Sequence, residues 1–113
     1  MHELAITESV VDAVTERTGT TPVAVVRLRV GRLAGVVPDA LRFCFELVTA
    51  GTPLEGAALE LEEPEGRGRC RTCEAEFVLA DLIMLCDCGS ADVEVLTGRE
   101  LAVASVVLAV TAS

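Results

Sequence analysis

Four cysteines crowded into one short segment constrain the fold of this chain more than any other feature. They are Cys70, Cys73, Cys86 and Cys88, in the stretch CRTCEAEFVLADLIMLCDCGS. The apolar residues between the two pairs are too few for an independent core, and a bound metal can supply the missing folding energy. Four thiolates on two tight turns match a closed, tetrahedral Zn²⁺ site. The sequence therefore predicts a zinc-ribbon-like module with a structural rather than a catalytic zinc.

Other readings of the cysteines stay open at this point. The second pair has the spacing C-x-C, which makes a narrower bite than C-x-x-C, and Asp87 is the only adjacent alternative ligand. Four thiolates could also hold a rubredoxin-like iron, although aromatic packing is expected around such a site and the module has only Phe77. A group of buried free thiols is the remaining alternative, and the clustering argues against it. The fifth cysteine, Cys44, is expected to be a small buried side chain.

Two amphipathic helices are expected before the cysteine module. The first covers residues 3–18, and its expected apolar stripe consists of Ile6, Val10, Ala13 and Val14. The second begins at Pro38, a residue that suits the first position of a helix, and ends at Gly51. Its buried face is expected to contain Leu41, Cys44, Phe45 and Val48.

Three strands are expected, over residues 23–30, over 57–63 and from 98 onward. If the first two pair, Glu60 and Glu62 can face Arg27 and Arg29 across the ladder. The last strand is so apolar that it needs a sheet to cover it, so we place it with the first two. A partner protein or a second copy of the chain is our hypothesis for what covers its outer edge.

These elements predict an α+β fold, with a small sheet of about three strands, two helices and an inserted zinc-ribbon-like cysteine module. The expected domains are 1–64 together with 99–113, and a zinc-binding module at 65–98. We expect linkers near 64–69, where the sequence PEGRGR is rich in glycine and arginine, and near 96–99.

Charge and composition exclude several classes of partner. The net charge of −9 repels a phosphate backbone, and three Phe with no Tyr or Trp offer little for stacking on bases. The longest apolar run, LAVASVVLAV, is about half of what a bilayer requires. The N-terminus lacks the pattern of a signal peptide. We therefore expect no nucleic acid and no membrane, and a cytoplasmic protein whose cysteines are free or metal-bound.

The N-terminus carries the only histidine, His2, between Met1 and Glu3. The α-amino group of Met1, with an ordinary pKa of about 7.7–8.0, can act as a neutral nitrogen donor near neutral pH. Together with the imidazole, the carboxylate and the backbone nitrogens between them, it forms a nitrogen and oxygen donor set. Such a set suits square-planar or tetragonal Ni²⁺ or Cu²⁺.

The combination of three segments is specific. MHEL at the start, VVRLRVGRLAGVVPDALRFCFELVTAGTPLEGAALELEE in the middle and CRTC…CDCGS…GREL after it resemble the HypA/HybF family of hydrogenase nickel-incorporation proteins. The resemblance implies a nickel metallochaperone that binds Ni²⁺ through Met1, His2 and Glu3, with a structural Zn²⁺ on the four cysteines of the module. It also implies a nickel-binding maturation GTPase and the [NiFe]-hydrogenase large subunit as partners. Some members of the family also serve urease.

Three other functional classes are compared with this hypothesis. A zinc-ribbon protein-interaction or regulatory module without metal transfer would bind zinc and be indifferent to changes at His2. A rubredoxin-like electron carrier would leave the N-terminal region unexplained. An enzyme has the least support, because the single histidine offers no nucleophile–base pair and the sequence contains no glycine-rich phosphate loop. Whether the chain works as a monomer or a homodimer stays open.

Overall fold

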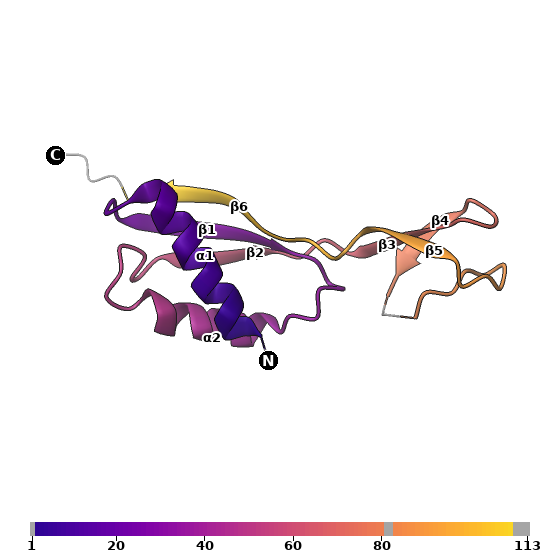
Figure 1. Ribbon diagram of the computed structural model, residues 1–113, viewed down its shortest axis with the longest axis horizontal. Coiled ribbons are helices and arrows are strands. Elements are labelled where there is room, and N and C mark those ends of the chain that lie inside the picture. The colour runs from indigo at the N-terminus through magenta and orange to yellow at the C-terminus, as the bar shows by residue number, and fades with distance from the viewer. Residues whose placement is uncertain (1, 81–82, 110–113) are drawn as a thin grey trace. The chain divides into compact units, whose positions relative to one another are not determined.

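A computed structural model of the chain describes residues 2–80 and 83–109 (Figure 1). Its elements in chain order are α1 (Glu3–Thr18), β1 (Val23–Val30), α2 (Pro38–Thr49), β2 (Ala58–Glu62), β3 (Gly66–Cys70), β4 (Glu76–Leu79), β5 (Val93–Thr97) and β6 (Leu101–Leu108). The described residues form two helices and two three-stranded sheets. The predicted α+β class is confirmed, as are both predicted helices. The part of the predicted last strand at 110–113 lies outside the described residues.

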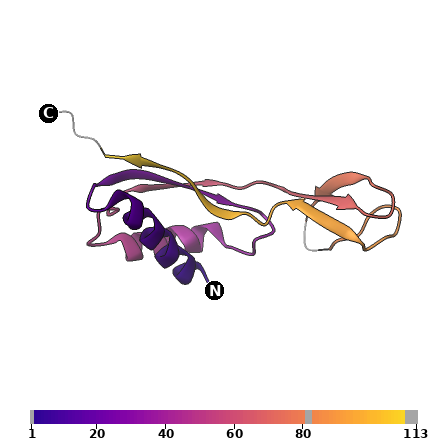
Figure 2. The ribbon, with the colours of Figure 1, turned by 45° about the horizontal axis from the view of Figure 1, so that its top comes forward.

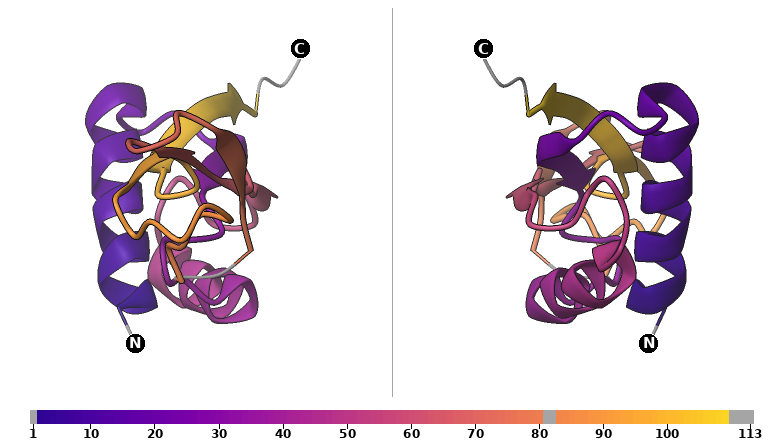
Figure 3. Two further views of the ribbon diagram at one scale, coloured as in Figure 1. Left: turned by 90° about the vertical axis from the view of Figure 1, so that its right-hand side faces the viewer. Right: turned by 90° about the vertical axis from the view of Figure 1, so that its left-hand side faces the viewer.

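The first sheet has the strand order β2-β1-β6, as expected for a chain whose last strand returns to the first two. Both helices lie on the same side of this sheet (Figure 2), and their axes cross rather than run parallel (Figure 3). The core between these layers consists mainly of Val11, Val14, Val26, Leu28, Leu41, Phe45 and Leu54. No helix of the described residues is long and apolar enough to span a membrane.

The predicted charge pairs between β1 and β2 are present. Arg27 Nε lies 2.9 Å from Glu60 Oε1, and Arg29 Nε lies 3.1 Å from Glu62 Oε2. All four side chains are well exposed. Such exposed pairs contribute about 0–1 kcal/mol each, so they support the register of β1 and β2 without being the main source of stability.

Of the predicted buried stripe of α1, Val14 is confirmed and the other three residues are wrong. The buried side chains are Glu3, Thr7, Val11 and Val14, whereas Ile6 and Val10 are half-buried and Ala13 is exposed. Thr7 can be buried because its hydroxyl donates to the carbonyls of Glu3 and Leu4, at 3.0 and 2.8 Å. A satisfied hydroxyl loses little on leaving water. In α2, Leu41 and Phe45 are buried as expected, while Cys44 and Val48 are half-buried.

The expected linker at 64–69 is also wrong, because Gly66–Cys70 is strand β3, the centre of a second sheet with the order β4-β3-β5. β3 pairs antiparallel with both neighbours. A Cβ on Gly66 would lie 2.6 Å from Leu33 Cδ1, and one on Gly68 would lie 2.8 Å from Val93 Cγ1. The two glycines therefore serve close packing rather than flexibility.

The chain divides into two compact units. The first contains the residues up to Leu28, Val36–Leu61 and the residues from Val103, and the second contains Arg29–Gly35 and Glu62–Ala102. The core of the second unit consists of Leu33, Cys70, Leu79, Cys86 and Val93. Leu33 comes from the loop after β1, so this loop supplies a core residue to the cysteine module. The domain boundaries expected from the sequence stay a prediction.

Candidate metal centre

The second unit brings four sulfur atoms together. The Sγ atoms of Cys70, Cys73, Cys86 and Cys88 all lie within 4.8 Å of one another. Cys73 Sγ is 3.5 Å from Cys86 Sγ, and Cys70 Sγ is 3.7 Å from Cys88 Sγ. Tetrahedral zinc with Zn–S bonds of about 2.3 Å requires sulfurs roughly 3.8 Å apart. The spacing therefore fits one zinc ion, and the narrow C-x-C pair brings both of its sulfurs into the group.

Two tight turns present these sulfurs. The first turn is closed by the N–H of Glu74, which donates to Cys70 O at 2.8 Å, and the second by the N–H of Gly89, which donates to Cys86 O at 2.8 Å. In each turn the residue after the second cysteine has a positive φ, 65° for Glu74 and 92° for Gly89. The sequence pointed to Gly89, since glycine favours this conformation, but it gave no sign that Glu74 adopts it.

The thiols differ in acidity. The N–H of Cys73 points at Cys70 Sγ and, against the opposing effect of burial, lowers the pKa of the Cys70 thiol to about 6, with help from the N–H of Thr72 and neighbouring thiols. The N–H of Cys88 lowers the pKa of the Cys86 thiol, but burial and the adjacent thiols together raise it to about 12. A divalent cation in place of these protons would stabilise all four thiolates, because each sulfur binds a metal as the anion.

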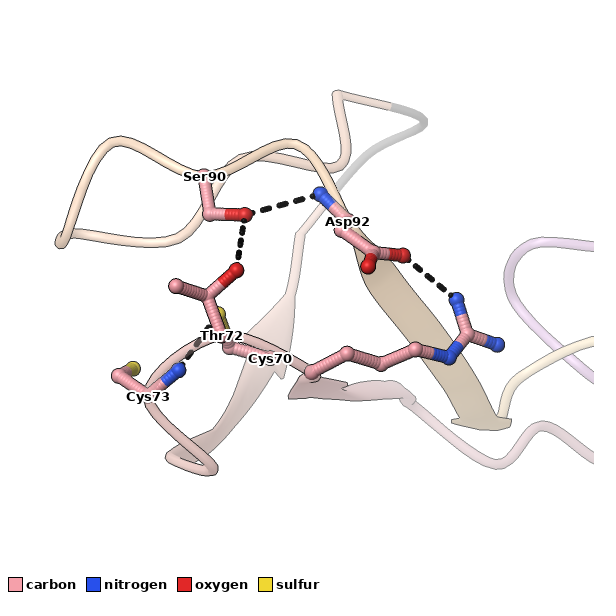
Figure 4. A network of polar contacts seen from close by, with 6 residues as sticks. Cys70, Thr72, Cys73, Ser90 and Asp92 are labelled. Carbon is pink, nitrogen blue, oxygen red and sulfur yellow. Dashed lines mark hydrogen bonds and ion pairs between the residues drawn. The ribbon is translucent and has the colours of Figure 1, made fainter.

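A polar network links the two turns without using sulfur (Figure 4). The Thr72 and Ser90 hydroxyl oxygens are 2.8 Å apart, and Ser90 Oγ also accepts from the N–H of Asp92 at 3.1 Å. Arg71 Nη1 donates to Asp92 Oδ1 at 2.9 Å. Sequence reasoning missed these residues, and only their places beside the cysteines could have suggested them.

The predicted nickel ligands lie at the start of α1. His2 is exposed at the N-cap position and makes no capping hydrogen bond to the described start of the helix. Glu3 is buried, and its Oε2 accepts from the N–H of Val37, at the start of α2, at 3.4 Å. Met1 lies outside the described residues. The structure thus places His2 in an exposed position at the start of α1 and the side chain of Glu3 in a buried one.

The fold and the four-cysteine cluster define a small α+β protein with a zinc-ribbon-like metal module. The sequence matches the family described as hydrogenase/urease nickel incorporation, metallochaperone, hypA, over residues 1–108. The chain belongs to this family, which confirms the resemblance inferred from its motifs.

Relatives named hydrogenase maturation factor HypA support the assignment. The one from Nostoc punctiforme is 46% identical over 101 residues, 89% of each chain. The one from Geotalea uraniireducens is 49% identical over 104 residues, 91% of this chain and 94% of the relative. Among solved structures, the solution structure of the Ni metallochaperone HypA from Helicobacter pylori has a TM-score of 0.66 at 18% identity, covering 96% of this chain and 97% of that one. At this identity the structural likeness shows the fold alone.

Proposed function

We propose that this chain is a nickel metallochaperone for [NiFe]-hydrogenase maturation, and that it binds Ni²⁺ through Met1, His2 and Glu3. The match of residues 1–108 to a nickel-incorporation family is the observation that carries the proposal. The sequence adds support, because His2, whose side chain is exposed, directly follows the amino-terminal Met1 and precedes the carboxylate residue Glu3. These nitrogen and oxygen donors suit Ni²⁺ better than they suit the softer metals that thiolates select.

The geometry of Glu3 favours a positioned site that can still release its ion. The hydrogen bond from the Val37 N–H fixes the first turn of α1 beside the start of α2, so His2 projects from a defined point. The imidazole remains open to solvent, which allows an incoming ligand from a recipient to displace it. Transfer by ligand exchange needs both properties, a site formed before nickel arrives and an accessible face.

The four cysteines of the module, Cys70, Cys73, Cys86 and Cys88, are proposed as the ligands of a structural Zn²⁺. Their sulfur spacing and the choice of four thiolates fit zinc. The ion would join the two turns and complete the small core around Leu33 and Val93. All four coordination positions are then taken by protein, so we propose a structural role for this site and no enzymatic activity for the chain.

The proposed partners follow from the family. They are a nickel-binding maturation GTPase, the large subunit of [NiFe]-hydrogenase and, as a further class, urease maturation proteins, all in the cytoplasm. A homodimer is an additional proposal. Its support is that β6, at the edge of the first sheet, exposes Leu101, Val103, Val107 and Leu108 and has no charged residue. Uncharged edge strands readily pair with other chains.

The nickel site can be tested with full-length protein that begins at Met1. We expect about one Ni²⁺ per chain beyond the zinc, measured by elemental analysis after equilibrium dialysis. His2→Ala should reduce nickel binding at least about tenfold, because a lost ligand removes more than 1.4 kcal/mol. One glycine added before Met1 should weaken binding as well, because it moves the amine out of chelating reach.

Glu8→Gln, an exposed change on the same helix, is the matched control and should bind nickel as the unaltered chain does. Equal nickel binding by His2→Ala would show that the proposed ligand set is wrong. Zinc without any nickel uptake would instead favour the alternative, a zinc-ribbon protein-interaction module without metal transfer.

A further inference from the structure

The two cysteine turns are connected by contacts that do not involve sulfur. Thr72 lies inside the first turn, between Cys70 and Cys73, and Ser90 follows the second turn. Their hydroxyl oxygens are 2.8 Å apart. The N–H of Asp92 donates to Ser90 Oγ at 3.1 Å and so fixes the position of that hydroxyl (Figure 4). The turns can therefore remain paired even when a sulfur has lost its metal.

These contacts extend the pairing of β3 with β5 in the second sheet. In the β3–β5 ladder Cys70 stands opposite Val93. One residue further, the N–H of Arg71 donates to Asp92 O at 2.9 Å, and the Arg71 guanidinium binds the Asp92 carboxylate, also at 2.9 Å. The pairing of β3 with β5 thus continues beyond Cys70 and Val93 toward the turns that carry the sulfurs.

We propose that Arg71, Thr72, Ser90 and Asp92 form a metal-independent clasp that holds the two cysteine turns at tetrahedral spacing and slows the loss of Zn²⁺. The inference rests on the proposed zinc ligands. Zinc leaves a four-thiolate site by breaking its Zn–S bonds one after another. A turn that has released the metal stays beside it while the clasp is closed, so its thiolate recombines at a high effective concentration.

The hydroxyl pair and the ion pair are both exposed to solvent, but only the ion pair depends on salt. Arg71 and Asp92 are about half exposed, so solvent and salt screen their attraction. The bond between Thr72 and Ser90 is independent of salt. We expect loss of this bond to speed zinc release by roughly two- to tenfold, the range that corresponds to one net hydrogen bond.

The clasp should also affect which metal ion the four cysteines bind, zinc or the transported Ni²⁺. Ni²⁺ favours square-planar or tetragonal sites, whereas zinc accepts the tetrahedral arrangement that the clasp maintains. A protein that carries nickel at its N-terminus must keep the same ion out of its cysteines. Opening the clasp should therefore increase the replacement of zinc by nickel, which is visible as sulfur-to-nickel charge-transfer absorption.

The test uses the full-length zinc-loaded chain and a chromophoric chelator. Thr72→Val keeps the side-chain shape but removes the hydroxyl, and Ser90→Ala removes the partner; both should release zinc faster. Thr72→Ser restores the hydroxyl and should release zinc at the unaltered rate. Arg67→Gln is the matched control, because it removes the Arg67–Glu65 ion pair of the same unit without touching the clasp.

Two measurements separate the possible failures. Zinc content is determined first, and less than one zinc per unaltered chain would overturn the ligand assignment. With zinc fully bound, equal release rates for Thr72→Val, Ser90→Ala and the unaltered chain would overturn the clasp. Equal acceleration by Thr72→Ser and Thr72→Val would overturn it too, since the hydroxyl would then be irrelevant. If Thr72→Val fails to bind zinc, the rate for Ser90→Ala decides.

Discussion

At the scale of single residues, the metal module depends on two backbone conformations that side chains disfavour. Glu74 has a φ of 65° and Gly89 a φ of 92°. For a residue with a Cβ, this left-handed region costs roughly 1–2 kcal/mol. The first turn contains this strain at Glu74, whereas glycine avoids it in the second.

Gly89→Ala should therefore lower the free energy of unfolding of the zinc-loaded chain by about 1 kcal/mol. The cause is backbone strain, because among the described residues no heavy atom beyond the two chain neighbours lies within 4 Å of an added Cβ. Glu74→Gly is the opposite test and should not destabilise the protein. Urea denaturation with zinc present measures both changes. A Gly89→Ala protein as stable as the unaltered chain would show that the turn relaxes to another conformation.

The sequence singled out the four cysteines as proposed metal ligands, but not the residues that connect their two turns. The cysteines can be recognised in the sequence from their metal-binding chemistry and their spacing. Gly89 can be recognised because glycine readily adopts a positive φ. Thr72 and Ser90 lie 18 positions apart and meet only when β3 pairs with β5. Hydroxyl residues are common in loops, so nothing in the sequence distinguishes these two before that pairing is known.

At the scale of helices and strands, the contacts of the first unit contribute very different amounts to the free energy of unfolding. Leu41 of α2 is fully buried, whereas Arg27 of β1 and Glu60 of β2 pair in solvent. A double-mutant cycle on Arg27→Ala and Glu60→Ala should give a coupling below about 1 kcal/mol, and less at high salt. Leu41→Ala should cost about 2–5 kcal/mol, because it leaves a cavity.

Chemical denaturation of the zinc-loaded variants measures both quantities. Phe43→Ala, an exposed change on the same helix, is the control and should alter stability little. A charge-pair coupling as large as the effect of Leu41→Ala would mean that the pairing of β1 and β2 is fixed by charge rather than by the core.

The hydrophobic periodicity of the sequence predicted where helices and strands lie better than it predicted which of their side chains are buried. The period of α1 was right, but hydrophobicity selected Ile6 over Thr7, although Thr7 satisfies its hydroxyl within the helix and is fully buried. The glycines of PEGRGR predict a linker at 64–69, where the structure has β3. They are required here by Leu33, Leu79 and Val93, whose contacts depend on the fold of the second unit.

At the scale of the whole molecule, the first sheet is completed by a strand from far along the chain. The 38 residues between Glu62 and Leu101 separate β2 from β6. Closing a flexible loop of this length costs roughly 3 kcal/mol. The folded second unit reduces this cost, because Arg29–Gly35 binds both ends of the inserted segment. The Arg32 N–H donates to Pro64 O at 3.0 Å and the Gly31 N–H to Glu100 O at 2.7 Å.

Removing zinc should therefore weaken the first unit as well as the second. Amides of Val26 and Leu28 in β1 should exchange faster in the metal-free chain, by an amount that corresponds to as much as about 3 kcal/mol. Hydrogen exchange followed by NMR measures this change, and Cys88→Ser should reproduce it without a chelator. Unchanged protection of β1 would mean that the sheet closes without help from the inserted unit.

This connectivity bears on how the protein is made in the cell. β6 is synthesised after every other described element, so β1 emerges with one side of its backbone still unpaired. The cysteine segment emerges before β6 and can fold around the proposed zinc ion during that interval. The supply of zinc during translation would then govern how soon a nascent chain becomes able to accept nickel at all.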